Sequence, residues 1–113
     1  MIPVRPKWSI YMLRCGDGSL YTGITTDVAR RVAEHRNGKG ARSLRGRKPL
    51  TLVLCSEVGD RSLATRIEMR VKRLDRAAKE KLVASPAGLL DLLEELRPGS
   101  TDRTRGQGKI AIG

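Results

Sequence analysis

The segment from residue 8 to residue 25 constrains the fold most, because two β-prone stretches flank a turn there. Residues 8–14 and 20–25 are rich in β-branched, aromatic and other apolar side chains, which favour strands. The Gly-Asp-Gly-Ser sequence at 16–19 supplies glycines, which tolerate positive φ angles in tight turns. The pattern therefore predicts an antiparallel hairpin near the amino-terminal end of the chain.

Each predicted strand carries one of the two tyrosines of a chain that has no Phe. Tyr11 ends the triplet Ser-Ile-Tyr, and Tyr21 opens the triplet Tyr-Thr-Gly. Neighbouring strands would bring the two phenols near each other, and a phenol can transfer protons in a phosphodiester-cleaving site. A single strand tyrosine is more often an ordinary cross-strand packing residue, so this position is a first indication only.

An amphipathic helix is predicted after the hairpin, with its N-cap at Thr26 or Asp27 and its end near Arg36. Its inward face combines apolar and basic residues at helical spacing: Val28, Arg31, Val32 and His35. Arg31 and His35 should thus point towards the sheet. A guanidinium binds phosphate oxygens and an imidazole moves protons near neutral pH. A structural role, with Arg31 on strand-end carbonyls and His35 satisfied in the core, is the alternative.

The charge of the chain indicates a polyanionic partner. Lys and Arg number 23 against 12 Asp and Glu, a net charge of +11. Residues 30–48 hold eight basic residues and one acid, and the Gly- and Arg-rich loop at 37–49 should act as a flexible arm on a phosphate backbone. No amphipathic anchor accompanies the charge, which favours nucleic acid over lipid, although a merely solvated basic surface is the alternative. The expected nucleic-acid contacts are Lys39, Arg42, Arg45, Arg47 and Lys48.

The rest of the chain predicts one more strand and three helices. The strand covers residues 50–55, and its nearly continuous apolar run indicates burial in the sheet. The helices are expected at residues 63–74, 76–84 and 86–96. Their expected N-terminal caps are Ser62, Asp75 and Ser85-Pro86. Glu68 borders the apolar face of the first of these helices, where it could also form a simple surface pair with Lys72.

These elements predict a single α+β domain at residues 8–96, built from an antiparallel hairpin, a third strand and four helices. Residues 1–7 form an N-terminal extension, and the basic tail at 97–113 is expected to be disordered. The chain lacks a membrane-length apolar stretch and a signal-peptide pattern, which predicts a cytoplasmic protein, nucleoid-associated when bound to DNA. Cys15 and Cys55 lack metal-ligand spacing and are expected to be free thiols, with a disulfide between them left open.

The order of these residues resembles the GIY-YIG nuclease superfamily over residues 8–83, most closely its small stand-alone bacterial members. It is also similar to the nuclease domain of structure-specific junction endonucleases. Five residues match positions that form the family's site: Tyr11, Tyr21, Arg31, His35 and Glu68. His35 matches a histidine found in several branches of the family. Ser9 and Thr22 depart from the name-giving triplets at backbone-shaping or packing positions.

The resemblance implies an α+β fold in which a three-stranded antiparallel sheet is flanked by helices. It also implies a metal-dependent endonuclease acting on DNA, for which branched, nicked or single-stranded forms are candidate substrates. Glu68 would bind Mg²⁺ or Mn²⁺, since one carboxylate with waters and a substrate phosphate suits such an ion. Arg31 would hold a phosphate oxygen, while Tyr11, Tyr21 or His35 would transfer the proton. Two alternatives remain: a non-catalytic nucleic-acid-binding protein with this fold, and a subunit that needs a protein partner to choose its substrate. Oligomeric state and the choice between DNA and RNA are not predicted.

Overall fold

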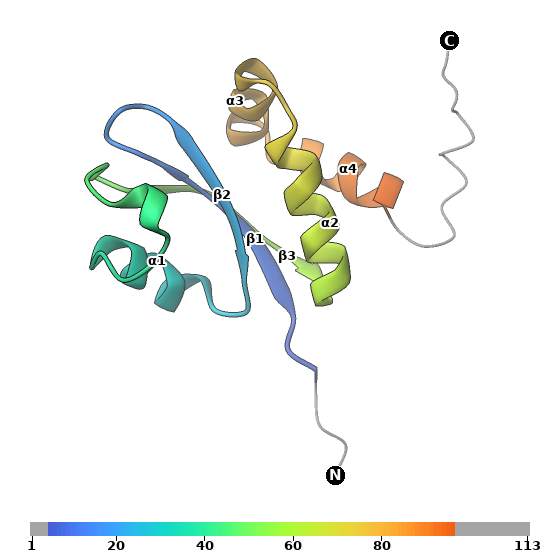
Figure 1. Cartoon of the computed structure of the whole chain (residues 1–113). Coiled ribbons are helices and arrows are strands. Elements are labelled where there is room, and N and C mark those ends of the chain that lie inside the picture. The colour runs from blue at the N-terminus through green and yellow to red at the C-terminus, as the bar shows by residue number, and fades with distance from the viewer. Residues whose placement is uncertain (1–4, 97–113) are drawn as a thin grey trace.

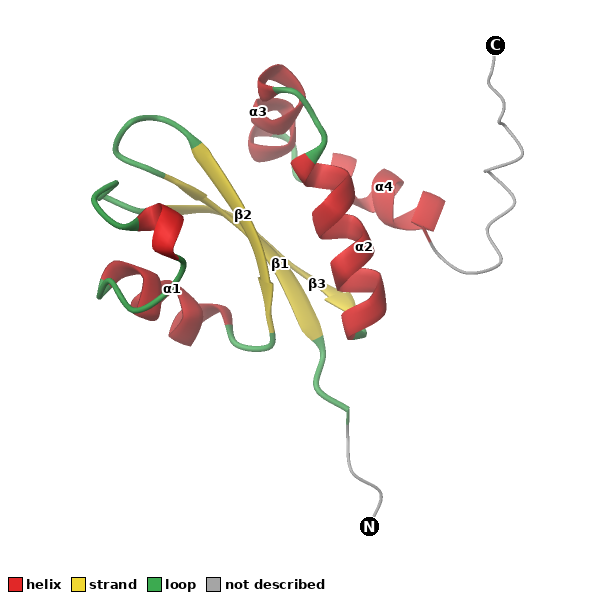
Figure 2. Ribbon diagram, in the orientation of Figure 1, coloured by secondary structure: helices red, strands yellow, loops and turns green. Residues whose placement is uncertain are grey.

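The computed structural model describes residues 5–96 and contains an antiparallel sheet with helices on both faces (Figures 1 and 2). The strands are β1 (Trp8–Arg14), β2 (Leu20–Thr25) and β3 (Thr51–Gly59), and their order in the sheet is β2-β1-β3. The predicted α+β fold is confirmed. Residues 1–4 and the tail predicted to be disordered lie outside the described residues. Within residues 5–96, no helix is long and apolar enough to cross a membrane.

The central strand is β1, and the prediction that the third strand is buried in the sheet was wrong. Four consecutive β1 residues are at most 1% exposed: Ile10, Tyr11, Met12 and Leu13. β3 instead forms one edge, where Leu52 is 40% exposed. Leu54, at 5% exposed, is the one fully buried residue of β3. An apolar run indicates a strand but does not distinguish an edge strand from a central one.

The sheet separates two apolar clusters, because successive side chains of a strand point to opposite faces. Ile10 and Met12 pack under three helices on one face: α2 (Arg61–Lys72), α3 (Arg76–Ala84) and α4 (Gly88–Leu96). Tyr11 and Leu13 pack on the other face, under α1 (Val28–Arg36) and the short 3₁₀ helix η1 (Arg42–Leu44). Tyr11 therefore shares a face with α1, as the helical spacing of α1 predicted.

The helix caps match the sequence in two cases and differ in two. Asp27 caps α1 and Asp75 caps α3, as predicted. Helix α2 begins earlier than expected, because Asp60 rather than Ser62 accepts the Leu63 N–H, at 2.9 Å. Both residue types are good N-caps, so local preference does not decide between them. Helix α4 begins at Gly88, because a turn occupies the residues after Ser85.

The basic loop between α1 and β3 is more ordered than a flexible arm. Leu44 of η1 is only 2% exposed and packs in the cluster that contains Tyr11. The Gly16 N–H donates to the Arg47 carbonyl at 2.7 Å, which joins the loop to the hairpin turn. The expected nucleic-acid contacts are nevertheless all exposed: Lys39, Arg42, Arg45, Arg47 and Lys48. The loop thus presents its cations from an anchored backbone.

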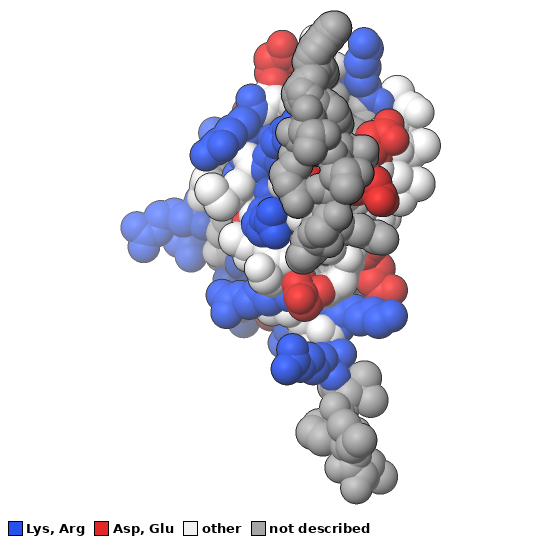
Figure 3. Space-filling view, turned by 90° about the vertical axis from the view of Figure 1, so that its right-hand side faces the viewer, with Lys and Arg blue, Asp and Glu red and all other residues white. Residues whose placement is uncertain are grey.

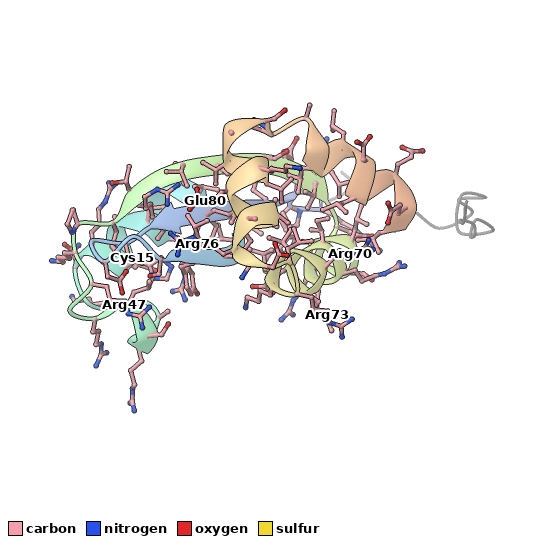
Figure 4. All side chains as sticks on the ribbon, turned by 90° about the horizontal axis from the view of Figure 1, so that it is seen from above. Cys15, Arg47, Arg70, Arg73, Arg76 and Glu80 are labelled. Carbon is pink, nitrogen blue, oxygen red and sulfur yellow. The ribbon has the colours of Figure 1, made fainter. Side chains whose placement is uncertain are left out.

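Two arginines and one glutamate join the hairpin to α3, and Figure 4 labels two of the three, Arg76 and Glu80. Both carboxylate oxygens of Glu80 accept from Arg14, at 2.7 and 2.9 Å, and Arg76 Nε donates to Glu80 at 3.0 Å. Arg76 also donates to the Gly18 carbonyl in the turn, at 2.7 Å. Arg14 first and Arg76 second lower the pKa of Glu80 from 4.5 to about 2.

This network should make the stability of the fold depend on pH in the acidic range. Because the pKa of Glu80 is lowered on folding, its ion pairs stabilise the fold above pH 4.5 and lose this effect as the pH falls towards about 2. The melting temperature of the wild type should therefore exceed that of Glu80→Gln near neutral pH, and the difference should close near pH 2. Glu94→Gln, on exposed α4 surface, is the control. A difference that does not change with pH would contradict this role.

Candidate active site

Four of the five predicted site residues lie together on the α1 face of the sheet. Tyr11 comes from β1, Tyr21 from β2, and Arg31 and His35 from α1. The Tyr11 and Tyr21 rings are 6.3 Å apart between centroids, and the His35 ring lies 5.9 Å from Tyr11 and 5.4 Å from Tyr21. Two strands and one helix thus bring three groups able to carry protons against one another.

Gly23 makes room for the buried phenol. It lies directly opposite Tyr11 in the β1–β2 register, and a Cβ at this position would overlap the Tyr11 phenol oxygen and ring. The missing side chain lets the phenol lie across the β2 backbone. The contact with Tyr11 explains why the second triplet has a glycine at position 23. Ser9 and Thr22 take no part in this contact.

His35 connects Tyr11 to the basic loop. The residue is only 3% exposed, and its Nε2 atom lies 2.7 Å from the Tyr11 hydroxyl oxygen. On the other side of the ring, the Ala41 N–H donates to Nδ1 at 3.1 Å. Nδ1 is therefore an acceptor, which assigns the proton of neutral His35 to Nε2 and makes His35 the donor to Tyr11. A Cβ at Gly40 would overlap the His35 ring, so this glycine permits the contact.

The electrostatic surroundings keep both groups uncharged near neutral pH. Burial, followed by repulsion from Tyr21, raises the pKa of Tyr11 to about 12, although Arg31 opposes this shift. Burial, followed by the charge of Arg31, lowers the pKa of His35, although Glu34 opposes this shift. Tyr11 is thus a protonated phenol, and His35 is a neutral imidazole in the tautomer set by Ala41.

Arg31 lies at the border between the buried phenols and the surface. Its side chain is 37% exposed, and Nη1 donates to Glu34 Oε1 at 3.0 Å. The same guanidinium is close enough to Tyr11 to lower the pKa of that phenol. The Glu34 bond, first among the causes, raises the pKa of Arg31, so the side chain is a permanent cation. Arg31 can therefore contact a substrate phosphate while its guanidinium stays next to Tyr11.

The structure does not join Glu68 to these four residues. Glu68 lies on α2, which covers the other face of the sheet (Figure 1), and its side chain is 20% exposed. Its carboxylate pairs with Lys72 Nζ at 3.2 Å. Over residues 5–96, no three His, Cys, Asp or Glu side chains gather in a way that could hold a metal ion. A cation here would have one protein carboxylate, a donor set that fits Mg²⁺, which usually keeps several waters.

Glu68 lies across the sheet from the buried Tyr11–His35 pair, but β2, the strand that carries Tyr21, is an edge strand. Helix α2 packs against β1 and β2, and β2 lies between α1 and α2 in Figure 1. Figure 4 shows Arg47 of the loop and Arg73 at the end of α2 on the same side of the molecule, far apart across the sheet. A polyanion lying along the outer edge of β2 would meet groups from both faces.

The sequence did not identify two contributors, the backbone at Gly40 and at Ala41. Both act through the chain rather than through side-chain chemistry, one by leaving space for His35 and the other by donating an N–H. The glycine was visible in the loop sequence, but its contact with His35 depends on how the loop returns over α1. Cys15 and Cys55 are free thiols, and the possible disulfide between them is not formed.

Gly23→Ala should destabilise the fold, because the added methyl group must displace Tyr11 or the β2 backbone. We expect a loss of about 1–3 kcal/mol in the free energy of unfolding, measured by urea denaturation. The loss should shrink in the background of Tyr11→Leu, which removes the overlapping phenol. Equal losses in the two backgrounds would show that the phenol is not the reason for the glycine.

Known proteins are similar to this chain in sequence and in structure. The profile of the GIY-YIG catalytic domain matches residues 7–81. The UPF0213 protein YhbQ of Escherichia coli strain K12 is 56% identical over 90 residues, which cover 80% of this chain and 90% of YhbQ. The solution structure of EF2693 from E. faecalis has 36% identity and a TM-score of 0.52, over 72% of this chain and 86% of that one. The solution structure of the UPF0213 protein BH0048 from Bacillus halodurans has 47% identity and a TM-score of 0.47, over 69% and 83% of the two chains.

Proposed function

Because the chain belongs to the GIY-YIG catalytic domain family, we propose that it is a metal-dependent endonuclease that hydrolyses phosphodiester bonds in DNA. One observation carries the proposal: a buried Tyr11–His35 pair lies beside Tyr21 and the partly exposed Arg31, under a loop with exposed cations. The cations bind the DNA backbone, and the cluster supplies proton transfer and charge stabilisation. Branched, nicked and single-stranded DNA are the substrates to try first.

Arg31 stabilises the transition state in this proposal. A phosphodiester gains negative charge on its non-bridging oxygens as the attacking water adds. Arg31 offers a cation at the border of the site, and its bond to Glu34 holds the side chain in place while leaving other N–H groups for the phosphate. The guanidinium fork suits two oxygens of one phosphate.

Tyr21 is our candidate for the general base. Tyr11 is 1% exposed, with a pKa raised to about 12, so its hydroxyl neither reaches a substrate water nor ionises readily. His35 already carries its proton on Nε2, and its other nitrogen, Nδ1, accepts the Ala41 N–H, so it can take up a second proton only by losing that hydrogen bond. Tyr21 is only partly buried and lies next to both.

The buried pair supports Tyr21 through a directed chain of hydrogen bonds. The Ala41 N–H donates to His35 Nδ1, and His35 Nε2–H donates to the Tyr11 oxygen. The Tyr11 hydroxyl proton is then free to point towards Tyr21, whose charge, after burial, raises the pKa of Tyr11. Tyr11 therefore stays protonated and stabilises negative charge that develops on Tyr21.

Glu68 would hold the metal, which when bound polarises the scissile phosphate and stabilises the leaving oxygen. The residue is a hard oxygen ligand on the helix that packs against β2, the strand that carries Tyr21. Mg²⁺ or Mn²⁺ would compete with Lys72 for the carboxylate, because Lys72 pairs with it at 3.2 Å. Substrate lying along the β2 edge would bring its phosphate between Glu68 and Arg31.

The proposal is tested by a cleavage assay with Mg²⁺ or Mn²⁺ and the variant Glu68→Gln. We expect cleavage by the wild type to require the metal, and Glu68→Gln to be slower by about 10²-fold or more while binding DNA normally. Glu57→Gln, an exposed carboxylate on β3, is the matched control and should cleave like the wild type. Wild-type activity in Glu68→Gln would contradict the assignment of the metal ligand.

The pairing of Glu68 with Lys72 favours a second candidate, a nucleic-acid-binding protein that keeps the fold without catalysis. This protein would bind DNA equally well with Glu68→Gln and show no cleavage of any substrate. Neutralising Arg42, Arg45 and Arg47 would weaken DNA binding. It would also make the slope of the logarithm of the binding constant against the logarithm of the salt concentration shallower by about 0.9 for each lost phosphate contact. For both candidate functions we propose a cytoplasmic location at the nucleoid, because DNA is the proposed ligand.

A further inference from the structure

The only tryptophan of the chain lies in a hollow outside the Tyr11–His35 cluster. Trp8 opens β1, next to the N-terminal end of α2, and borders a hollow of about 310 Å³. The residues lining this hollow are Arg5, Pro6, Trp8, Asp60, Arg61 and Ser62. A smaller hollow of about 140 Å³ shares Asp60 and Ser62 with it and extends to Arg66. We call the two together the Trp8 pocket.

The charge around the Trp8 pocket suits an anionic ligand. Arg5, Arg61 and Arg66 line it, and all three are exposed. Asp60 is the one acid lining either hollow within residues 5–96, and its carboxylate already accepts the Leu63 N–H at 2.9 Å as the cap of α2. Figure 3 shows basic side chains in blue at the lower end of the described surface.

The indole is the group in the Trp8 pocket that can select a ligand. Trp8 is only partly buried, and the Arg61 guanidinium lies 5.5 Å from the centre of its ring. Tryptophan with arginine beside it is the combination that stacks a nucleobase and holds the adjoining phosphate. In a duplex the faces of the bases are already stacked on each other, so the indole can receive only an unpaired base.

We infer that the Trp8 pocket binds an unpaired nucleobase of a single-stranded DNA segment, with Arg5 and Arg61 on its phosphates. The inference rests on the proposed function and deepens it, because it selects substrates with a single-stranded branch or end. Trp8 precedes Tyr11 by three residues on β1, about 10 Å along the strand, but faces α2, the helix that also carries Glu68. A strand held at Trp8 thus lies on the same face of the sheet as the proposed metal ligand.

Trp8 fluorescence tests the inference directly, because it reports from this pocket alone. The full chain is titrated with a single-stranded oligothymidine in EDTA, where no metal-dependent cleavage occurs. We expect saturable quenching by the single strand, none by a blunt duplex of equal length, and weaker quenching in Arg61→Ala. Absence of quenching, or equal quenching by the duplex, would overturn the inference.

Two variants separate stacking from packing. Trp8→Leu keeps an apolar side chain but has no aromatic face. Trp8→Phe keeps an apolar side chain and an aromatic face. Measured by anisotropy of a labelled oligothymidine, Trp8→Leu should weaken binding by about 5- to 150-fold, and Trp8→Phe should restore most of the affinity. Equal affinity in wild type and Trp8→Leu would contradict the pocket. Quenching without cleavage of any DNA would support the Trp8 pocket and reject the proposed endonuclease. Cleavage without quenching would support the endonuclease and reject the Trp8 pocket.

Discussion

Arg31→Ala should lower the single-turnover rate of DNA cleavage by about 10²–10³-fold, with little change in DNA affinity. The reason is that this cation acts on charge that appears only in the transition state. Arg31 also lowers the pKa of Tyr11, so its loss leaves the buried phenols without their nearest cation. Affinity should change little, because the exposed cations of the loop at 37–49 carry most of the backbone contacts.

Arg30→Ala is the matched control for this prediction. Arg30 is the neighbouring residue on α1, is exposed, and pairs with Asp27 at 4.0 Å rather than with Glu34. Its replacement removes the same charge from the same helix but not from the phenol cluster. A similar loss of rate in the two variants would show that Arg31 acts through the overall charge and has no role at the scissile phosphate.

Tyr21→Phe should lower the cleavage rate by about 10²–10⁴-fold, the usual contribution of a positioned general base. The change also removes the oxygen towards which the buried Tyr11 hydroxyl points, so some loss in the free energy of unfolding is expected, and the rates are compared under conditions where both proteins are folded. Single-turnover rates of the wild type and Tyr21→Phe, measured with saturating enzyme on the same DNA, provide the test.

Tyr11→Phe gives the contrasting pattern. It leaves the buried Nε2–H of His35 without its acceptor, which should cost about 1–3 kcal/mol of folding free energy. Because Tyr11 acts through Tyr21 in this mechanism, Tyr11→Phe should slow cleavage less than Tyr21→Phe does. If Tyr11→Phe slows cleavage more than Tyr21→Phe, Tyr11 is the base and the roles of the two phenols are reversed.

Local sequence patterns predicted most of the elements, because their determinants are short-range. The Gly-Asp-Gly-Ser turn predicts the hairpin, and the spacing of Val28, Arg31, Val32 and His35 predicts the inner face of α1. Aspartate caps predict where α1 and α3 begin. The edge position of β3 was missed, because strand order depends on long-range pairing that the composition of one strand does not encode.

The candidate site was predictable to the extent that its chemistry resides in side chains. Tyr11, Tyr21, Arg31 and His35 come together as expected, since strand and helix periodicity place them on one face. The tautomer of His35 was not predictable, because it depends on the path of the loop that brings the Ala41 N–H to Nδ1. The separation of Glu68 by the sheet was not predictable either, because it depends on which face α2 covers.

The most direct test of the account is the single-turnover cleavage of nicked, branched and single-stranded DNA by the wild type and Tyr21→Phe. The assay is run with Mg²⁺ and repeated in EDTA, and DNA binding is measured on the same substrates. The account predicts Mg²⁺-dependent cleavage of at least one substrate by the wild type, slowed at least about 100-fold in Tyr21→Phe with affinity retained. Tight, salt-dependent binding to all substrates with cleavage of none, or equal cleavage by the two proteins, would contradict it.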